Sequence, residues 1–289
     1  MAAARWIPAV SVLAGCIVVH AAPDALERAR DLYNKTDFEA ALAVLEKDRL
    51  TSAPARLLEG KILFQLGDYK RAVERLEQAA KLDRRSSEAA HWLGKAHGRR
   101  AETASFLTAP RYAVECRKAF ENAVRLDPAN KEAWSDLFEY YLEAPGFLGG
   151  GLDKAEAAAK RIEQLDPVER YYAAARLAEK KKDFRAAEQN WRRAAELAPD
   201  DLGRVLDVAR FLARQGRISE SEEMFAKAEA MWPGSPKLWF ARAQVYVNGK
   251  RNLETARRLL DQYIRSTRLT PDDPPRHEAR KLLKAASGG

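Results

Sequence analysis

Prolines that follow helix-like runs recur at a nearly constant spacing, and they constrain the fold of this chain more than any other feature. They close four similar tripeptides, LeuAspPro at 126–128, LeuAspPro at 165–167, LeuAlaPro at 197–199 and MetTrpPro at 231–233. Successive prolines are 39, 32 and 34 residues apart. A period in this range indicates an array of similar supersecondary units, each of which buries its apolar face against the next.

The composition predicts that these units are helical. The chain of 289 residues is 46% hydrophobic and rich in Ala, Leu, Glu, Arg and Lys, which are good helix formers. No segment alternates β-branched or aromatic residues with polar ones, as a half-buried strand does. Basic residues outnumber acidic ones by 50 to 42, which favours acidic partners without specifying a function.

Small and aromatic residues occupy fixed positions within the repeats. The segment from 168 carries Tyr171, Ala174, Ala175, Ala178, Phe184, Ala187, Trp191, Ala194 and Pro199. The segment from 202 carries Val205, Val208, Ala209, Leu212, Gly216, Ile218, Ser221, Phe225, Ala228 and Pro233. This pattern resembles the tetratricopeptide repeat, a pair of antiparallel helices with a period of 34 residues. The resemblance implies an all-α, right-handed superhelical solenoid of about seven helix pairs with a C-terminal capping helix.

Alignment on this pattern predicts the boundaries of the units. Residues 1–21 are expected to form an export signal, residues 22–269 the repeat array, and residues 270–289 a capping helix and tail. The seven units are expected near 22–52, 53–86, 87–130, 131–167, 168–201, 202–235 and 236–269.

Two units carry insertions between their helices. The third unit gains ten residues near 102–112, and the fourth gains five, ProGlyPheLeuGly at 145–149. Loops with apolar residues in a solenoid tend to lie over a groove or to contact a partner. The expected contact residues on the two inserts are Phe106, Leu107, Tyr112, Phe147 and Leu148.

The second insert leads into three consecutive glycines, at 149–151. A phosphate-binding loop of the Walker type needs Lys and Ser or Thr directly after Gly151, where this chain has Leu152 and Asp153. The segment is therefore interpreted as a structural or partner-docking loop. It resembles a ProGly-x-x-GlyGlyGly turn of a group of exported bacterial tetratricopeptide proteins, and that resemblance implies no activity.

The N-terminus reads as an export signal with two processing routes. Arg5 precedes an apolar stretch at 6–19, which at 14 residues is too short for a membrane span. Cleavage after Ala21 would release a soluble periplasmic protein. Alternatively, LeuAlaGlyCys at 13–16 resembles a bacterial lipobox, in which Cys16 would be lipidated. The apolar run continues beyond Cys16, which favours the first route, and both routes stay open.

No constellation of residues with catalytic or metal-binding spacing is present in the sequence, so neither an enzyme nor a cofactor is expected. Cys116 occupies a position where the repeat requires a small buried residue, and it is interpreted as a core thiol. An enzyme would require folding to assemble distant residues. A pocket that gathers Glu139, His91 and His97 with perturbed ionisation would be its sign.

The resemblance implies that the inner face of the array binds ligands, because positions 5 and 9 of each family unit face it. At position 9 the units carry Arg30, Lys61, Lys95, Glu139, Arg176, Arg210 and Gln244. At position 5 they carry Leu26, Leu57, His91, Ser135, Tyr172, Leu206 and Phe240. The expected partner-binding groove is thus basic and apolar, and the candidate contact residues are Arg30, Lys61, Lys95, Tyr172, Arg176, Leu206, Arg210 and Phe240.

These observations favour a non-enzymatic scaffold or adaptor of the bacterial cell envelope that binds a protein or peptide with acidic and apolar residues. The alternative is a binder of an anionic envelope polymer, whose binding would be lost at high salt. Export disfavours nucleic acid as a partner, and a membrane would be contacted only through lipidated Cys16.

Overall fold

The computed structural model describes residues 24–288, and within that range it contains fifteen α-helices, one 3₁₀ helix and no strand. The segment expected to be an export signal, with Cys16, lies outside the described residues. The helices are α1 (Ala25–Asn34), α2 (Phe38–Lys47), α3 (Ala53–Leu66), α4 (Tyr69–Leu82), α5 (Ser87–Thr103), α6 (Ala109–Leu126), α7 (Lys131–Glu143), η1 (Gly146–Leu148), α8 (Leu152–Leu165), α9 (Glu169–Lys180), α10 (Phe184–Leu197), α11 (Leu202–Arg214), α12 (Ile218–Met231), α13 (Pro236–Asn248), α14 (Leu253–Arg265) and α15 (Arg276–Ser287).

Aspartates start the second helix of several pairs. Asp37, Asp68 and Asp183 each accept a hydrogen bond from the backbone N–H three residues later. This cap satisfies one of the backbone donors that the first turn of a helix leaves without a partner. The residue after each aspartate is aromatic, and it is buried at Phe38 and Tyr69 but exposed at Phe184.

Consecutive helices pack in pairs, and each pair packs on the next. Small residues at the contacts let the helix axes approach closely, because a large side chain there would hold them apart. Ala187 and Ala194 are buried on α10, and Trp191 fills the space between them and the neighbouring helices. The all-α solenoid of seven helix pairs with a terminal helix, as predicted from the sequence, is confirmed.

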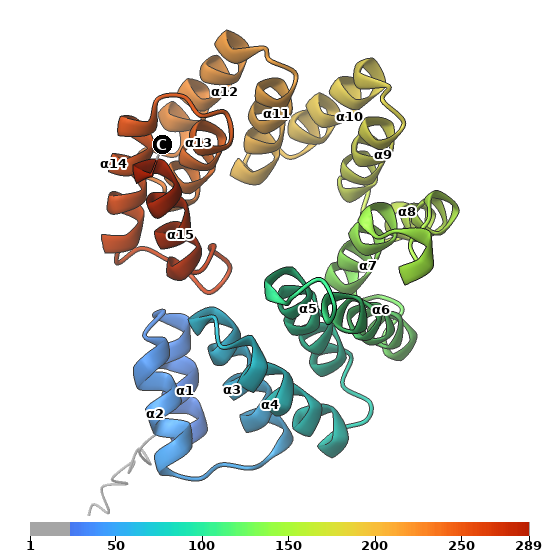
Figure 1. Ribbon diagram of the computed structural model, residues 1–289, viewed down its shortest axis with the longest axis vertical. Coiled ribbons are helices and arrows are strands. Elements are labelled where there is room, and N and C mark those ends of the chain that lie inside the picture. Colours follow the sequence, from blue (N-terminus) through green and yellow to red (C-terminus); the bar gives the residue numbers. More distant parts are fainter. Residues whose placement is uncertain (1–23, 289) are drawn as a thin grey trace, which may run out of the picture.

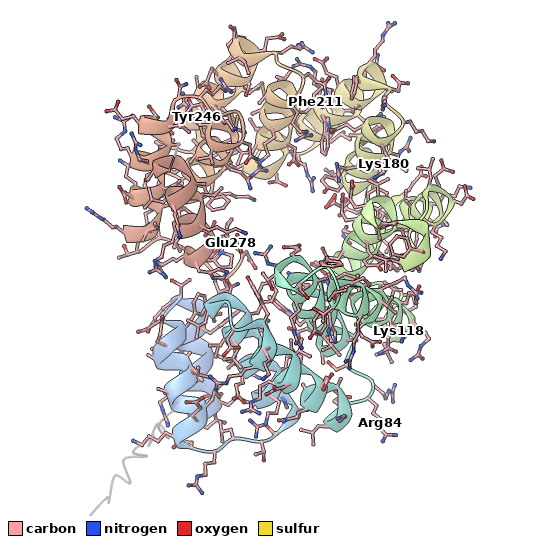
Figure 2. All side chains as sticks on the ribbon, viewed as in Figure 1. Arg84, Lys118, Lys180, Phe211, Tyr246 and Glu278 are labelled. Atoms are coloured by element: carbon pink, nitrogen blue, oxygen red, sulfur yellow. The ribbon has the colours of Figure 1, made fainter. Side chains whose placement is uncertain are left out.

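The array curves until its two ends meet, so the molecule is a ring (Figure 1). Helices α5, α7, α9, α11 and α13 lie nearer the centre than their pair partners α6, α8, α10, α12 and α14 (Figure 1). Helix α15 packs on α13 and α14 and lies beside the N-terminal helices. With all side chains drawn, the centre of the ring stays open in this view (Figure 2).

His277 on α15 joins the two ends of the chain. Its Nε2 lies 2.8 Å from the hydroxyl of Tyr69 on α4, and its Nδ1 lies 3.2 Å from the backbone oxygen of Gln65 on α3. Since a carbonyl oxygen only accepts, Nδ1 donates and Nε2 accepts from the tyrosine. The Gln65 side chain in turn donates to the backbone oxygen of Pro271 at 2.7 Å.

Two further contacts hold the ring closed. Glu278, labelled in Figure 2, forms an ion pair with Arg99 of α5. Arg276 donates to the backbone oxygen of Thr36, in the turn between α1 and α2, at 3.4 Å. The capping helix therefore covers the end of the seventh unit and also contacts the first three. No helix among residues 24–288 combines the length and apolar character needed to cross a membrane.

Candidate binding groove

Three cavities follow one another along the inner face of the first four units. The first encloses about 460 Å³ between α1, α3 and α5, the second about 630 Å³ between α3, α5 and α7, and the third about 430 Å³ between α5, α6, α7 and η1. The first two share Lys61 and Glu88, and the second and third share Lys95 and Asp136. These three neighbouring cavities are together called the N-terminal groove below.

Lysines and aromatic rings alternate along this groove. Lys61 Nζ lies 5.5 Å from the ring centroid of Tyr33 and 5.0 Å from that of Trp92, and Lys95 Nζ lies 4.3 Å from Trp92. Contacts of this kind contribute about 0.5–1 kcal/mol each at exposed sites. They hold the two ammonium groups at defined places on the groove wall.

Lys61 and Lys95 differ in their charge partners. Lys61 forms an ion pair with Glu88 at 3.0 Å. Lys95 forms no ion pair with any residue in 24–288, and neither does Arg30, which lines the first cavity. Arg30 and Lys95 are therefore the two cations of the predicted row that are free to meet an acidic partner.

The predicted basic row is neutralised in the middle of the ring. Arg176 binds Glu139 at 2.7 Å and Glu143 at 2.9 Å, and Tyr172 donates to Glu139 at 2.9 Å. Hydrogen bonding to Glu139 raises the pKa of Arg176 further above its usual range. Both candidate residues are thus engaged within the chain, and this part of the predicted basic row offers no free cation to a partner.

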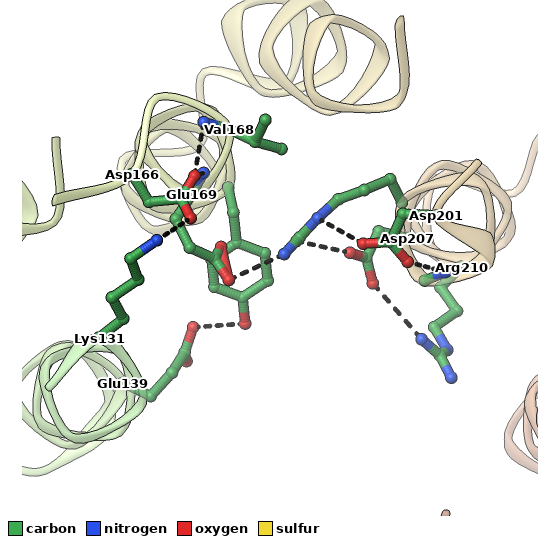
Figure 3. Close-up of polar contacts among 11 residues, drawn as sticks. Lys131, Glu139, Asp166, Val168, Glu169, Asp201, Asp207 and Arg210 are labelled. Atoms are coloured by element: carbon green, nitrogen blue, oxygen red, sulfur yellow. Dashed lines mark hydrogen bonds and ion pairs between the residues drawn. The ribbon is translucent and has the colours of Figure 1, made fainter. Parts of the chain in front are cut away.

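Arg210 is neutralised in the same way by a carboxylate network on the inner face. It lies 3.4 Å from Asp207, which also contacts Arg204 at 3.3 Å (Figure 3). Arg204 continues to Glu169 at 2.8 Å, and Glu169 belongs to the preceding unit (Figure 3). Burial raises the pKa of both carboxylates.

The second cavity is likewise not basic, because six carboxylates and three lysines line it. The carboxylates are Glu88, Glu132, Asp136, Asp166, Glu169 and Asp272. The inner face therefore presents alternating charges of both signs rather than a positive surface.

Two members of the predicted apolar row are not on the groove surface. Leu206 is 0% exposed and Phe240 is 6% exposed. Leu206 packs in the core between the sixth and seventh units, and the Phe240 ring lies 5.2 Å from that of Tyr263. Burial of such side chains stabilises the fold by about 1.5–3 kcal/mol each. Their expected role as partner contacts is corrected, since a partner cannot reach them.

The first insert is mostly helical rather than a loop. It lengthens α5 to 17 residues and α6 to 18, so that only 104–108 lies outside helices. Tyr112 was expected on a loop but lies in α6, where Arg100 packs over its ring at 4.0 Å. Phe106 and Leu107 remain in the turn and are 84% and 76% exposed.

The second insert folds into η1 and the glycines that follow. Phe147 is 81% exposed, whereas Leu148 turns inward and lines the third cavity. Tyr140 fixes the turn by donating to the backbone oxygen of Leu148 at 2.9 Å. Gly149 has φ +89°, and a Cβ at Gly150 would lie 1.9 Å from the backbone oxygen of Ala144. These two glycines are thus required by the turn itself.

The residues that would signal an enzyme do not meet. His91 lies 2.7 Å from Asp136 and lines the second cavity, while His97 stacks on Tyr112 and Glu139 binds Arg176. None of the three cavities of the N-terminal groove is lined by His91, His97 and Glu139 together. Residues 24–288 contain no cluster of three or more His, Cys, Asp or Glu side chains that could hold a metal ion.

Sequence reasoning missed Trp92 and the ring-closing residues. Trp92 precedes Lys95 by three residues on one helix, a spacing that brings side chains together and is visible in the sequence. The contact of His277 with Tyr69 joins residues 208 positions apart, and no local pattern signals it.

Comparisons with known proteins agree with this architecture. The chain matches the family model "TPR repeat" over residues 60–99 and the model "Tetratricopeptide repeat" over 172–236 and 206–274. No curated protein matches it.

Solved structures show the same fold. A thermophilic TPR protein of Thermus thermophilus is 23% identical, with a TM-score of 0.54, and the match covers 65% of this chain and 97% of that one. A tetratricopeptide repeat protein of Parabacteroides merdae is 14% identical (TM-score 0.57, 91% and 98% covered), and yeast Tom70 is 17% identical (TM-score 0.58, 91% and 53% covered). The matched repeats and the paired-helix solenoid together establish that this chain belongs to the tetratricopeptide repeat family.

Proposed function

We propose that this protein is a non-enzymatic scaffold of the bacterial cell envelope that binds a segment of another protein in the N-terminal groove. Tetratricopeptide repeat proteins generally act as scaffolds for protein interactions. The observation that carries the proposal is the succession of three cavities along α1, α3, α5 and α7, in which neighbouring cavities share lining residues. The location in the envelope rests on the export signal expected at the N-terminus.

The groove suits an extended segment more than a compact ligand. Neighbouring cavities share lining side chains, and lysines, carboxylates and aromatic rings line them. Arg30 lines the first cavity and Lys95 lines the second and third, and both are free to pair with carboxylates of the bound segment. The aromatic rings and the aliphatic stems of the lysines would contact the apolar side chains of the bound segment. The proposed site therefore consists of Arg30, Lys61, Trp92 and Lys95 rather than the full predicted row.

Site-specific crosslinking in native envelopes tests this proposal. The photoreactive residue p-benzoylphenylalanine would replace Ser135, which lines the second cavity, or Lys160, which is exposed on α8. We expect a protein adduct from position 135 alone, lost in an Arg30→Glu, Lys95→Glu variant and kept in a Lys160→Glu variant. Equal adducts from both positions would remove the groove from consideration.

Salt distinguishes the proposed partner from an anionic polymer. A protein segment held by ion pairs and apolar contacts stays bound at moderate salt, whereas a polymer held by charge alone dissociates because screening weakens exposed ion pairs. Retention of envelope polysaccharide at low salt only, without a protein adduct, would replace the proposal with the polymer alternative.

A further inference from the structure

The two inserts together build the third cavity. Its walls include the rings of Phe64, Phe120 and Tyr140 and the side chain of Leu148. The C-terminal part of the lengthened α5 supplies one side and η1 the other, and Arg117 of α6 packs against Gly149. A unit without the inserts would lack η1 and the last turn of α5, so this cavity belongs to these two units alone.

The size and lining of this cavity suit an apolar group. Its volume of about 430 Å³ lies within the range of about 300–1,000 Å³ that is typical of small-molecule pockets. Such sites combine apolar walls with a small number of polar groups that set orientation. Here the charged residues of the lining are Lys95, Arg99, Glu102, Asp136 and Glu143.

The two basic residues that line this cavity differ in their partners. Arg99 forms ion pairs with Glu102 and Glu278, whereas Lys95 has no ion-pair partner within 24–288. Of the carboxylates, Glu143 binds Arg176 and Lys180, and Asp136 is hydrogen-bonded to His91. The complement of an unpaired cation beside an apolar cavity is a carboxylate beside an apolar side chain.

We propose that the third cavity receives one bulky apolar side chain of the bound segment while a neighbouring acidic residue of that segment pairs with Lys95. This inference rests on the proposed function and specifies its partner. It places the apolar contact at the inserts, in the half of the ring opposite the buried Leu206 and Phe240. Phe147, which directly precedes the lining residue Leu148, is exposed.

A random nonapeptide library displayed on phage is the probe. Selection on the full chain is expected to enrich peptides that carry Asp or Glu within three residues of Phe, Leu or Trp. For one enriched peptide, replacement of its bulky residue by Ala is expected to weaken binding about 10-fold to 100-fold, as loss of about 1.5–3 kcal/mol of apolar burial predicts. Affinities would be measured by fluorescence anisotropy.

Variants of the protein separate the two parts of the site. Ala113→Trp, or independently Ala101→Trp, fills the cavity and should abolish the preference for a bulky residue while acidic peptides still bind. Lys95→Glu should abolish the preference for acidic residues. Ala226→Trp, on an exposed position of α12, is the matched control, and circular dichroism establishes that each variant is folded.

The outcomes distinguish this inference from the proposed function. The inference is overturned if acidic peptides bind equally well with Ala in place of the bulky residue and bind equally to wild type and to both cavity-filling variants. That result leaves the scaffold proposal standing. Failure to enrich any peptide whose binding depends on Arg30 or Lys95 overturns both.

Discussion

Two glycines one turn apart on α5 provide a sharp test of how the third unit is packed. A Cβ built on Gly94 would lie 2.4 Å from Cδ1 and 2.5 Å from Cε1 of Phe120, whereas one on Gly98 would lie 3.4 Å from Sγ of Cys116. The first contact is far inside van der Waals distance and the second is ordinary. Phe120 is buried and its ring also contacts His91, so it is not free to move away.

The same substitution should therefore have opposite effects at the two positions. Replacement of Gly by Ala in a helix interior stabilises by about 0.5–1 kcal/mol, through the lower entropy of the unfolded chain. Gly98→Ala should gain that amount. Gly94→Ala adds overpacking of about 1–3 kcal/mol, so its net effect should be a loss of up to about 2.5 kcal/mol.

Urea unfolding followed by circular dichroism measures both free energies of unfolding. A Gly94→Ala, Phe120→Leu double variant should recover part of the loss relative to the sum of the single variants, because the smaller side chain makes room for the methyl group. Equal stabilisation by Gly94→Ala and Gly98→Ala would show that the ring relaxes freely and would refute this account of the packing.

Three further predictions concern ionisable groups. Burial, with Arg99 nearby, lowers the pKa of His277, so the ring-closing contact should be complete above the unfolded value of about 6.5 and weaken as pH falls below it. Amide protection factors in α1 and α2, which correct for the intrinsic pH dependence of exchange, should fall between pH 7.5 and 5.5 in wild type but not in His277→Gln, and equal falls would contradict this. Burial raises the pKa of Cys116 to about 12, so iodoacetamide at pH 8 should alkylate the native protein far more slowly than the denatured one, and equal rates would count against a core thiol. Glu59, only 3% exposed, accepts hydrogen bonds from Arg56 at 2.5 Å and from Arg75 at 2.7 Å. Glu59→Gln should lower the free energy of unfolding by about 2–3 kcal/mol, which is less than the loss from breaking a fully buried ion pair because both arginines reach solvent. An unchanged urea midpoint would refute the pairing.

Local patterns predicted the repeats because each helix pair is specified within about 34 residues. The spacing of Pro128, Pro167 and Pro199 and the small residues around them report contacts between neighbours in sequence, and those contacts form the solenoid. Ring closure could not be predicted in this way. It depends on the small rotation between each unit and the next, added over seven units, and no local sequence pattern specifies that total.

The groove was predicted in part for a related reason. Position within the repeat placed Lys61 and Lys95 on the inner face, where the structure has them. It did not predict that Arg176 would bind Glu139 of the preceding unit, because such pairing depends on the lateral register of neighbouring helices. Leu206 and Phe240 turned into the core because an apolar side chain at the edge of an interface gains more by burial than by facing water.

Closure of the ring changes how cooperative this array can be. In a linear stack each terminal unit has one neighbour, so unfolding starts at the ends and moves inward. Here α1 and α2, at ten residues each the shortest α-helices in 24–288, belong to a unit that α15 contacts from the other side. The stack thus behaves as a cycle in which the first unit has two neighbours. Loss of any one interface between units leaves a linear stack in which every unit still has a neighbour. Only the loss of a second interface separates a group of units from the rest of the stack.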